Sequence, residues 1–288
     1  RDFPEKLLEG VDTVVYLAAI SNDPIGNKFE KPTLDINFYA AIDIAKKAKI
    51  QGVKKYIYAS SCSVYGAAED KPRTEESDVN PLTAYAKSKI YAEDGLALLA
   101  GKNFQVTCHR FATACGMSER LRLDLVLNDF VAGAITSGVI GILSDGTPWR
   151  PLINVLDMAR AIRWSHERKN ANGGNYLVIN TGSNNWNFTV KELAEKVQHF
   201  LPETKISINK NAAPDKRSYR VDFSLFEKLA PNHQPLFNLE NSVKGLIDGY
   251  LAIRFKDKDF RNSNFMRLNI INELLEGNFI DSDLRLVV

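Results

Sequence analysis

The sequence predicts an α/β protein in which helices cover a parallel β-sheet. Two observations support this fold class. Short segments rich in β-forming residues alternate with segments of helical periodicity along the chain. The strand-like segment at residues 53–60 also runs directly into small polar residues, Ser60-Ser61-Cys62-Ser63. Such residues are expected at the carboxyl edge of a parallel sheet, where ligands bind.

The elements are expected in a regular order. Strands are expected at residues 11–19, 53–60, 104–110 and 176–180, with an extended segment at 146–156. Helices are expected at residues 32–51, 81–100, 121–137, 157–168 and 189–200, the last with Thr189 as its N-cap. Loops are expected at residues 22–31 and 62–80, a turn at 111–116, and one more strand and helix within 205–250.

Composition excludes several classes of function. The chain has 288 residues, of which 44% are hydrophobic and 25% charged, as in an ordinary globular protein. A net charge of +2 gives no electrostatic reason to expect nucleic acid or a membrane surface as a partner. Cys62, Cys108 and Cys115 lack metal-site spacing, and the four histidines are scattered, so no metal site is expected. Reduced thiols predict a cytoplasmic protein.

Tyr85 and Lys89 carry the strongest chemical signal. Residues four apart on a helix lie one above the other, and a nearby ammonium group favours the phenolate form of tyrosine. A phenol with a pKa near 10 must lose about three units, or about 4 kcal/mol, to act as a base near neutral pH. The pair therefore predicts alcohol oxidation, in which Tyr85 takes the hydroxyl proton as hydride leaves for a cofactor. A solvated lysine beside an interfacial tyrosine is the structural alternative.

Several motifs together resemble one family, the extended short-chain dehydrogenases/reductases that act as nucleotide-sugar epimerases and dehydratases. Residues 59–66 resemble its small-Ser-Ser-x-x-Val-Tyr-Gly motif, and Tyr85 and Lys89 its Tyr-x-x-x-Lys motif. Four further matches, with Tyr16 in place of a family histidine, lie at residues 16–19, 35–37, 149–157 and 217–222. The matches follow the order of the family from residue 11 to about residue 250.

The resemblance implies a Rossmann-like, doubly wound parallel sheet with a smaller C-terminal substrate-binding α/β region. Residues 1–120 are expected to be the dinucleotide-binding part, and residues 121–288 mainly the substrate-binding region with a C-terminal helical extension. Some later segments are expected to return to the first part. The family's glycine-rich Gly-x-x-Gly-x-x-Gly turn is not found in the sequence. We therefore expect the chain to be a fragment without its N-terminal strands; the alternative is a protein without that phosphate cradle.

The resemblance also implies the roles of individual residues. The catalytic group is Tyr85, Lys89 and Ser61, in which Ser61 hydrogen-bonds the reacting sugar oxygen. The residues expected at the cofactor, besides Tyr85 and Lys89, are Leu17, Ala18, Ala19, Asn37, Ala59, Ser60 and Ala112. The residues expected at the substrate, besides Ser61, are Cys62, Ser63, Thr113, Asn128, Arg150 and Arg217. The two arginines suit a diphosphate because a guanidinium group offers a planar fork of donors.

Structural alternatives stay open for several of these residues. Ser61 also fits a strand-end cap, Asn37 a helix interior, and Arg150 stacking on the adjacent Trp149. Family dehydratases carry an acidic pair where Cys62 and Ser63 stand here, which argues against a 4,6-dehydratase. Cys62 itself is expected either to act as an acid, as in one reducing branch of the family, or to be a small buried residue.

The function predicted from the resemblance is NAD-dependent epimerisation of a nucleotide-diphosphate sugar, most simply at C4. An NADPH-dependent reductase or epimerase using Cys62 and a non-catalytic dinucleotide-binding protein are the alternatives. NADP stays an alternative cofactor because the residues that choose it precede Arg1. A homodimer is expected through the helices at 32–51 and 81–100, and an amphipathic helix is expected at 265–275 in the extension.

Overall fold

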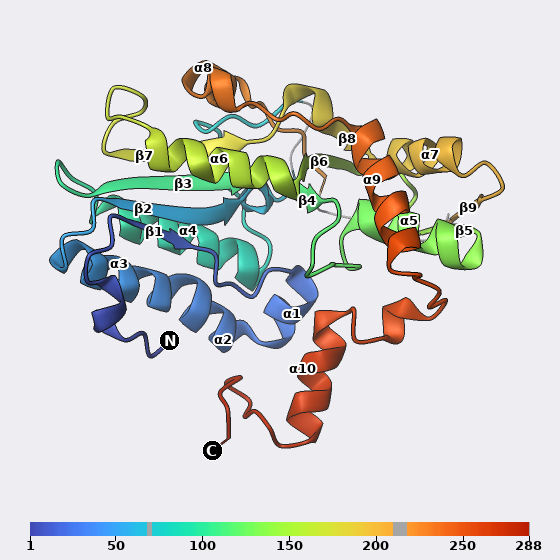
Figure 1. Ribbon diagram of the computed structural model, residues 1–288, viewed down its shortest axis with the longest axis horizontal. Coiled ribbons are helices and arrows are strands. Elements are labelled where there is room, and N and C mark those ends of the chain that lie inside the picture. The colour runs from blue at the N-terminus through green and yellow to red at the C-terminus, as the bar shows by residue number, and fades with distance from the viewer. Residues whose placement is uncertain (68–70, 210–217, 288) are drawn as a thin grey trace.

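A four-stranded parallel sheet forms the centre of the first half of the protein (Figure 1). The structure is a computed structural model that describes residues 1–67, 71–209 and 218–287 of the chain. Its strand order is β1-β2-β3-β7. The strands are β1 (Thr13–Tyr16), β2 (Lys55–Ser61), β3 (Gln105–Phe111) and β7 (Tyr176–Thr181). All three pairings are parallel, which confirms the predicted α/β fold class.

Helices cover both faces of this sheet, as Figure 1 shows. On one face lie α3 (Ala40–Ile50) and α4 (Ala84–Ala97), and on the other lies α6 (Val155–Glu167). Tyr56, Tyr58 and Val106 of the strands pack with Ala45 and Leu96 of the helices in one buried cluster. This core holds α4, which carries Tyr85 and Lys89, against the sheet.

The second half forms two small sheets and a helical cluster. The sheets contain β4 (Thr113–Cys115), β6 (Trp149–Asn154) and β8 (Asn187–Thr189), and β5 (Val139–Ile142) with β9 (Lys205–Ile208). The helices of this cluster are α5 (Val126–Ser137), α7 (Val190–Phe200) and α9 (Leu239–Ala252), whereas α8 (Ser224–Leu229) packs with α6 and β7 of the main sheet. Because β7 belongs to the first sheet, the two halves share chain segments, and the boundary expected at residue 120 stays a prediction.

Short helical turns connect the larger elements. They are η1 (Glu5–Leu8), η3 (Cys62–Tyr65), η4 (Asn184–Trp186), η5 (Pro231–His233) and η6 (Phe260–Asn262). Two further pieces, α2 (Glu30–Leu34) and the π-helical η2 (Asp35–Tyr39), lead directly into α3. The helix expected at residues 32–51 is thus present, but a π-helical turn interrupts it around Asn37.

The loop expected at residues 22–31 is wrong, because α1 (Asp23–Lys28) occupies most of it. Asn22 accepts a hydrogen bond from the Ile25 backbone amide, and Pro24 stands in the first turn. Asn and Pro break helices in the interior but favour helix starts, so the same residues that predict a loop began a helix here.

Other boundaries moved for similar reasons. Helix α4 starts after its N-cap Thr83 and not at Pro81, and α5 starts at Val126 and not at residue 121. The turn expected at residues 111–116 contains strand β4, which is too short to show a periodicity. The N-cap role of Thr189 is confirmed, with a complete capping box to Glu192.

The C-terminal extension returns to the N-terminal part. Helix α10 (Arg267–Glu276) places Leu268, Ile271 and Leu275 against a cluster that contains Ile25 and Phe29. In Figure 1, α10 lies beneath α1 and α2. In the parts of the chain that the structure describes, no helix combines the length and apolar character needed to cross a membrane.

Candidate active site

The catalytic residues expected from the sequence meet at the carboxyl edge of the main sheet. Ser61 is the last residue of β2, and Tyr85 lies in the first turn of α4. The Ser61 hydroxyl lies close enough to the Tyr85 phenol to lower the pKa of that phenol. Gly26 of α1 lies beside Tyr85, so closely that a Cβ atom there would be 3.3 Å from the Tyr85 Cβ. The geometry supports a serine and a tyrosine that share one reacting oxygen.

Lys89 lies one turn further along α4 and is buried, with 2% of its surface exposed. Its Nζ donates a hydrogen bond of 2.7 Å to the Ala59 carbonyl. The same Nζ lies 4.7 Å from the ring centre of Tyr58 and 5.5 Å from that of Tyr85. Burial lowers the pKa of Lys89 to about 7, partly offset by the nearby Glu93 carboxylate.

The electrostatics of Tyr85 differ from the sequence expectation. Burial raises the pKa of Tyr85, while the nearby Ser61 hydroxyl and the charge of Arg122 lower it. Lys89 donates its hydrogen bond to a backbone carbonyl, and burial favours its uncharged form. The expected lowering of the tyrosine pKa by this lysine is therefore wrong for the protein without cofactor.

The segment expected beside the cofactor follows β1. Leu17 is 59% exposed, Ala18 is exposed and Ala19 is half-buried, so this strand end is open to a ligand. Asn37 is fully buried and bonds the backbone of Ile20 through both its Oδ1 and its Nδ2. Its Nδ2 also donates to the Ser88 hydroxyl (3.0 Å), so Asn37 fixes the backbone that follows β1. The expected cofactor contact of Asn37 stays a prediction.

Ser60 also has a structural partner. Its hydroxyl donates to Glu93 of α4, and Glu93 forms a buried ion pair of 2.7 Å with Arg110 of β3. Arg110 in turn donates to the Tyr65 hydroxyl (3.1 Å). The Ser60 hydroxyl thus has a structural role, and the expected cofactor contact of Ser60 stays a prediction. Glu93 was missed from the sequence, although it follows Lys89 by four residues, a spacing that places both on one helix face.

Cys62 is fully buried, and its thiol points to the Arg110 carbonyl (3.0 Å). Burial raises the pKa of this thiol well above its ordinary value. This burial favours the alternative of a small buried residue, and the expected substrate contact of Cys62 stays a prediction. The adjacent Ser63 differs, because its Oγ is buried without a hydrogen-bond partner among the described residues.

The substrate-side residues divide into two groups. Asn128 is buried and accepts from the Gly116 amide (3.0 Å) while it donates to the Arg122 carbonyl (3.0 Å). It therefore supports the loop between these residues, and its expected substrate contact stays a prediction. Thr113, in β4, is half-buried, whereas Ala112 beside it is buried and bonds the Thr181 carbonyl through its amide.

Arg150 approaches the site from β6. It is half-buried, and its Nη1 donates to the Trp149 carbonyl (2.8 Å). Both Arg150 and Tyr85 act electrostatically on the pKa of the buried Tyr219, so these three residues lie in one region. Stacking on Trp149 belongs to Arg220, at 5.2 Å from the ring, and not to Arg150. Arg217 lies outside the described residues.

The residues at this edge fit a dinucleotide beside Tyr85. An open strand end with small side chains at Ala18 and Ala19 allows close approach of a flat ring, and the orphaned Ser63 hydroxyl offers a hydrogen bond to a bound molecule. Among the described residues, no group of three or more His, Cys, Asp or Glu side chains is arranged to hold a metal ion.

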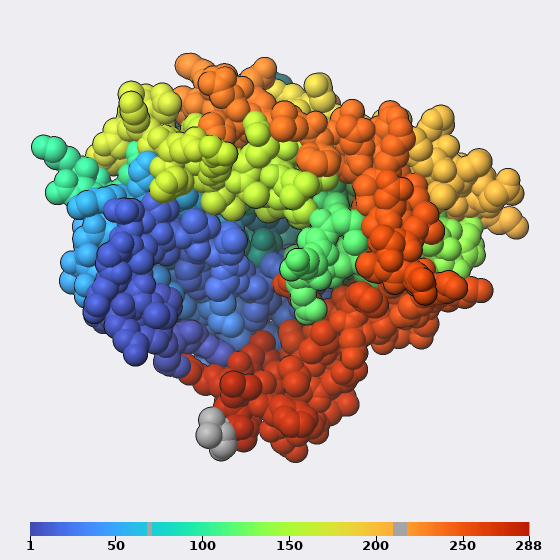
Figure 2. All heavy atoms as spheres, in the orientation of Figure 1, coloured from blue at the N-terminus to red at the C-terminus, as the bar shows by residue number. Residues whose placement is uncertain are grey.

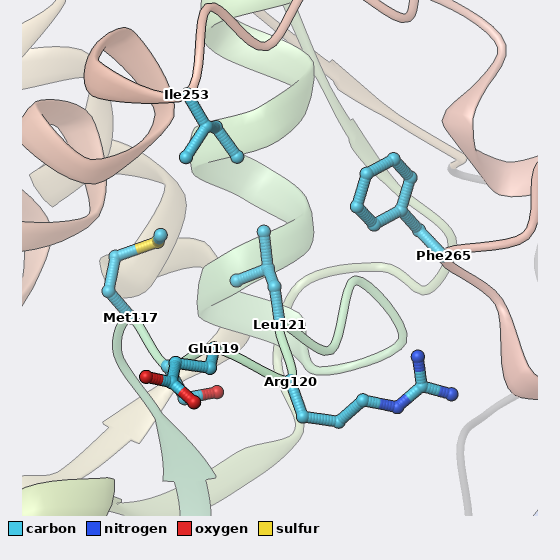
Figure 3. A pocket seen from close by; sticks show the side chains of 7 residues that line it. Met117, Glu119, Arg120, Leu121, Ile253 and Phe265 are labelled. Atoms are coloured by element: carbon cyan, nitrogen blue, oxygen red, sulfur yellow. The ribbon is translucent and has the colours of Figure 1, made fainter.

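A separate pocket of about 420 Å³ lies further toward the C-terminal extension. Figure 3 shows four of its apolar side chains, Met117, Leu121, Ile253 and Phe265, with Glu119 and Arg120 beside them. No residue that the sequence predicts for the site lines this pocket, so it is distinct from the edge that carries Tyr85.

Comparisons with known proteins identify the family of the chain. Residues 2–182 match the NAD dependent epimerase/dehydratase family. A Methanocaldococcus jannaschii protein assigned as a UDP-glucose 4-epimerase is 25% identical over 264 residues, which cover 86% of this chain and 80% of the relative.

Two solved structures share the fold. One is an NAD-dependent NDP-hexosamine 5,6-dehydratase, TunA, of tunicamycin biosynthesis, with a TM-score of 0.76, 22% identity and coverage of 90% of this chain and 82% of that one. The other is a UDP-glucuronic acid 4-epimerase from Bacillus cereus in complex with UDP-glucuronic acid and NAD, with a TM-score of 0.74, 21% identity and coverage of 86% and 78%. These likenesses confirm the expected Rossmann-like fold, and the family confirms NAD as the expected cofactor. Because the family model matches residues 2–182, well over half of the sequence, the chain belongs to the NAD-dependent epimerase/dehydratase family.

Proposed function

We propose that this protein is an NAD-dependent epimerase that inverts C4 of a nucleotide-diphosphate sugar. The position of Ser61 at the end of β2, close to Tyr85 in the first turn of α4, is the observation that carries the proposal, because both hydroxyl groups can then reach one substrate oxygen. Lys89 lies one turn away on the same helix face. The name of the archaeal relative and that of the Bacillus cereus enzyme, both 4-epimerases, support the choice of carbon.

The chain's own residues account for the proton transfers. Tyr85 Oη takes the proton of the sugar hydroxyl and later returns it, while the Ser61 hydroxyl holds the sugar oxygen in place. The chemistry that NAD would supply here is acceptance of the hydride of the sugar carbon and its return to the opposite face after the keto sugar has turned over. Leu17, Ala18 and Ala19 line the open strand end where it would lie.

Tyr85 must ionise for this reaction although burial raises its pKa. Ser61 and Arg122 both favour the phenolate, and the positive charge of an oxidised nicotinamide acts in the same direction. The extra acid that a 4,6-elimination of water requires is not needed, which agrees with Cys62 and Ser63 at the position of the acidic pair in family dehydratases.

The test uses UDP-, GDP-, CDP- and dTDP-sugars, each incubated with the protein and NAD, followed by chromatography with mass detection. We expect one new product of unchanged mass without net formation of NADH. Tyr85→Phe should lower its rate by about 10² to 10⁴-fold, the usual range for loss of a general acid–base group. Cys62→Ala is the matched control and should retain turnover, because its thiol is bonded to a backbone carbonyl.

Other products would reject the proposal. Loss of water would indicate a dehydratase, and a gain of two hydrogens with NADPH would indicate a reductase. No conversion of any sugar nucleotide would favour a dinucleotide-binding protein without catalysis.

We also propose a homodimer and a cytoplasmic location. Tyr39 and Tyr91 are 60% and 46% exposed, and both rings contact Phe38, at centroid distances of 4.6 and 5.8 Å. This exposed aromatic patch lies on the helices expected to pair in a dimer.

The cysteines Cys62, Cys108 and Cys115 are free and buried, which suits a reducing compartment such as the cytoplasm. Microscopy of a fluorescent fusion would test the proposed location.

A further inference from the structure

Two arginines from distant parts of the chain meet at the open end of β1. Arg122 Nη1 donates to the Ser21 hydroxyl oxygen (3.0 Å), and Arg267 Nη1 donates to the same oxygen (3.3 Å). Ser21 directly follows Ile20, the residue whose backbone is held by Asn37. Figure 2 shows the surface hollowed between the blue N-terminal part, the green residues near 120 and the red C-terminal part.

This cluster has an excess of positive charge. Arg122 is paired with Asp124 (2.6 Å), whereas Ser21 is the hydrogen-bond partner of Arg267 among the described residues. Arg120 and Arg122 repel the charge of Arg267, and Asp124 attracts it. Three guanidinium groups therefore act against one carboxylate. Such an arrangement costs free energy unless an anion lies among the cations.

The cluster lies beside the catalytic tyrosine. The charge of Arg122 acts on Tyr85. Asn22 donates to Asp124 (2.7 Å), and Asp23 accepts from Thr83, the N-cap of the helix that carries Tyr85. Through these contacts the arginine cluster and the start of α4 hold the same short segment that follows β1.

Ser21 is also prepared to donate. Its oxygen accepts from two guanidinium groups, so its own proton is left for a third group, and none of the described residues accepts it. The guanidinium group of Arg267 and the hydroxyl donor of Ser21 match the oxygens of a phosphate group, while Arg122, whose Nε and Nη2 hold both carboxylate oxygens of Asp124, adds positive charge beside them.

We propose that Arg122, Arg267 and Ser21 bind the pyrophosphate group common to NAD and to nucleotide-diphosphate sugars. The C-terminal extension thus supplies a ligand-binding residue, and the packing of Leu268 and Ile271 of α10 near Ile25 of α1 holds that residue at the site. This inference rests on the proposed function, because both ligands belong to that reaction.

The test is calorimetric titration of the intact protein with two probes, NAD and UDP. Arg267→Gln should raise the dissociation constant of at least one probe by about tenfold or more, as expected when a charged hydrogen bond is lost. The probe that weakens identifies the source of the phosphate. Arg267→Lys, which keeps the charge but loses the fork, should fall between the wild type and the glutamine variant.

Lys258→Gln is the matched control, because it removes the same charge from an exposed site in the same extension. If Arg267→Gln does not fold, Ser21→Ala gives the second measurement and should weaken the same probe severalfold. Unchanged dissociation constants for both probes, or an equal change in the lysine control, would overturn the inference.

Binding is measured without turnover, so the two proposals can fail separately. A protein that binds NAD or UDP through Arg267 but converts no sugar keeps this inference and loses the proposed function. A protein that epimerises a sugar with unchanged affinities in Arg267→Gln keeps the function and loses the inference.

Discussion

Lys89 and Tyr85 show how burial changes the meaning of a motif. Their spacing of four residues predicts that the lysine charge lowers the pKa of the tyrosine. The structure places Lys89 in a nearly inaccessible position, where its pKa falls to about 7 and its Nζ bonds the Ala59 carbonyl. The ammonium group is therefore a tether between α4 and the end of β2 as well as a charge.

This burial predicts a pH-dependent stability. Lys89 releases its proton near pH 7 when folded, against about 10.4 when unfolded, so the unfolded state binds more protons between these values. The free energy of unfolding should then rise with pH from about 7 to 10, by at most about 1.4 kcal/mol per pH unit from this residue. Below pH 7 Lys89 carries its charge in both the folded and the unfolded state, so the full loss of stability from burying that charge is present.

The measurement is urea unfolding of the wild type and of Lys89→Met at several pH values from 6 to 10. The variant should lack this rise, so its stability relative to the wild type should be greatest at low pH. Equal pH slopes in the two proteins would contradict a depressed lysine pKa.

Helix α4 and strand β3 are joined by the buried pair of Glu93 and Arg110. Arg110 reaches both carboxylate oxygens of Glu93, and Glu93 also accepts from Ser60. Since Ser61 follows Ser60 directly, this ion pair holds the strand end that carries Ser61, a catalytic residue in the proposed reaction. Charged groups at this depth depend on each other, because neither can be solvated alone.

Glu93→Gln should therefore destabilise the protein by about 3–5 kcal/mol, the usual cost of leaving one buried charge unpaired. Equilibrium denaturation in urea measures this loss. Glu167→Gln is the matched control: it breaks an ion pair with Arg163 in which both side chains are exposed, and it should cost under about 1 kcal/mol. Similar losses of stability in both variants would show that the buried Glu93–Arg110 pair contributes no more to stability than an exposed pair.

The assembly prediction concerns the surface formed by η2 and α4. If the exposed rings of Tyr39 and Tyr91 pair with a second copy, the double variant Tyr39→Glu/Tyr91→Glu should be a monomer, because two charges would be buried in an apolar contact. Light scattering after size-exclusion chromatography gives the mass. Leu251→Glu, at an exposed position of α9, should stay a dimer, and a monomeric wild type would reject the assembly.

Much of the fold could be predicted because its signals are local. The four strands of the main sheet and the helices on its faces follow from periodicity, and all were expected near their observed positions. The misplaced parts are short. Strands β4 and β8 have three residues each, and α1 begins with Asn22 and Pro24, residues that serve loops and helix starts equally.

The candidate site was predictable in its identity and less so in its contacts. Tyr85, Lys89 and Ser61 do converge at one edge of the sheet. Asn37 and Asn128 are expected to bind ligands, and in the structure their side-chain amides form hydrogen bonds with backbone atoms. An asparagine in a motif is equally suited to both uses, and no local pattern separates them.

The order of elements, the tyrosine–lysine pair and the family follow from the sequence, because each depends on residue types at short, regular spacings. The partner of each polar group depends on packing between distant segments. Cys62 turns to the Arg110 carbonyl, and Arg267 reaches Ser21 across 246 residues, because the core brings these segments together. A buried polar group must bond whatever neighbour the fold provides, and that neighbour is set by three-dimensional packing.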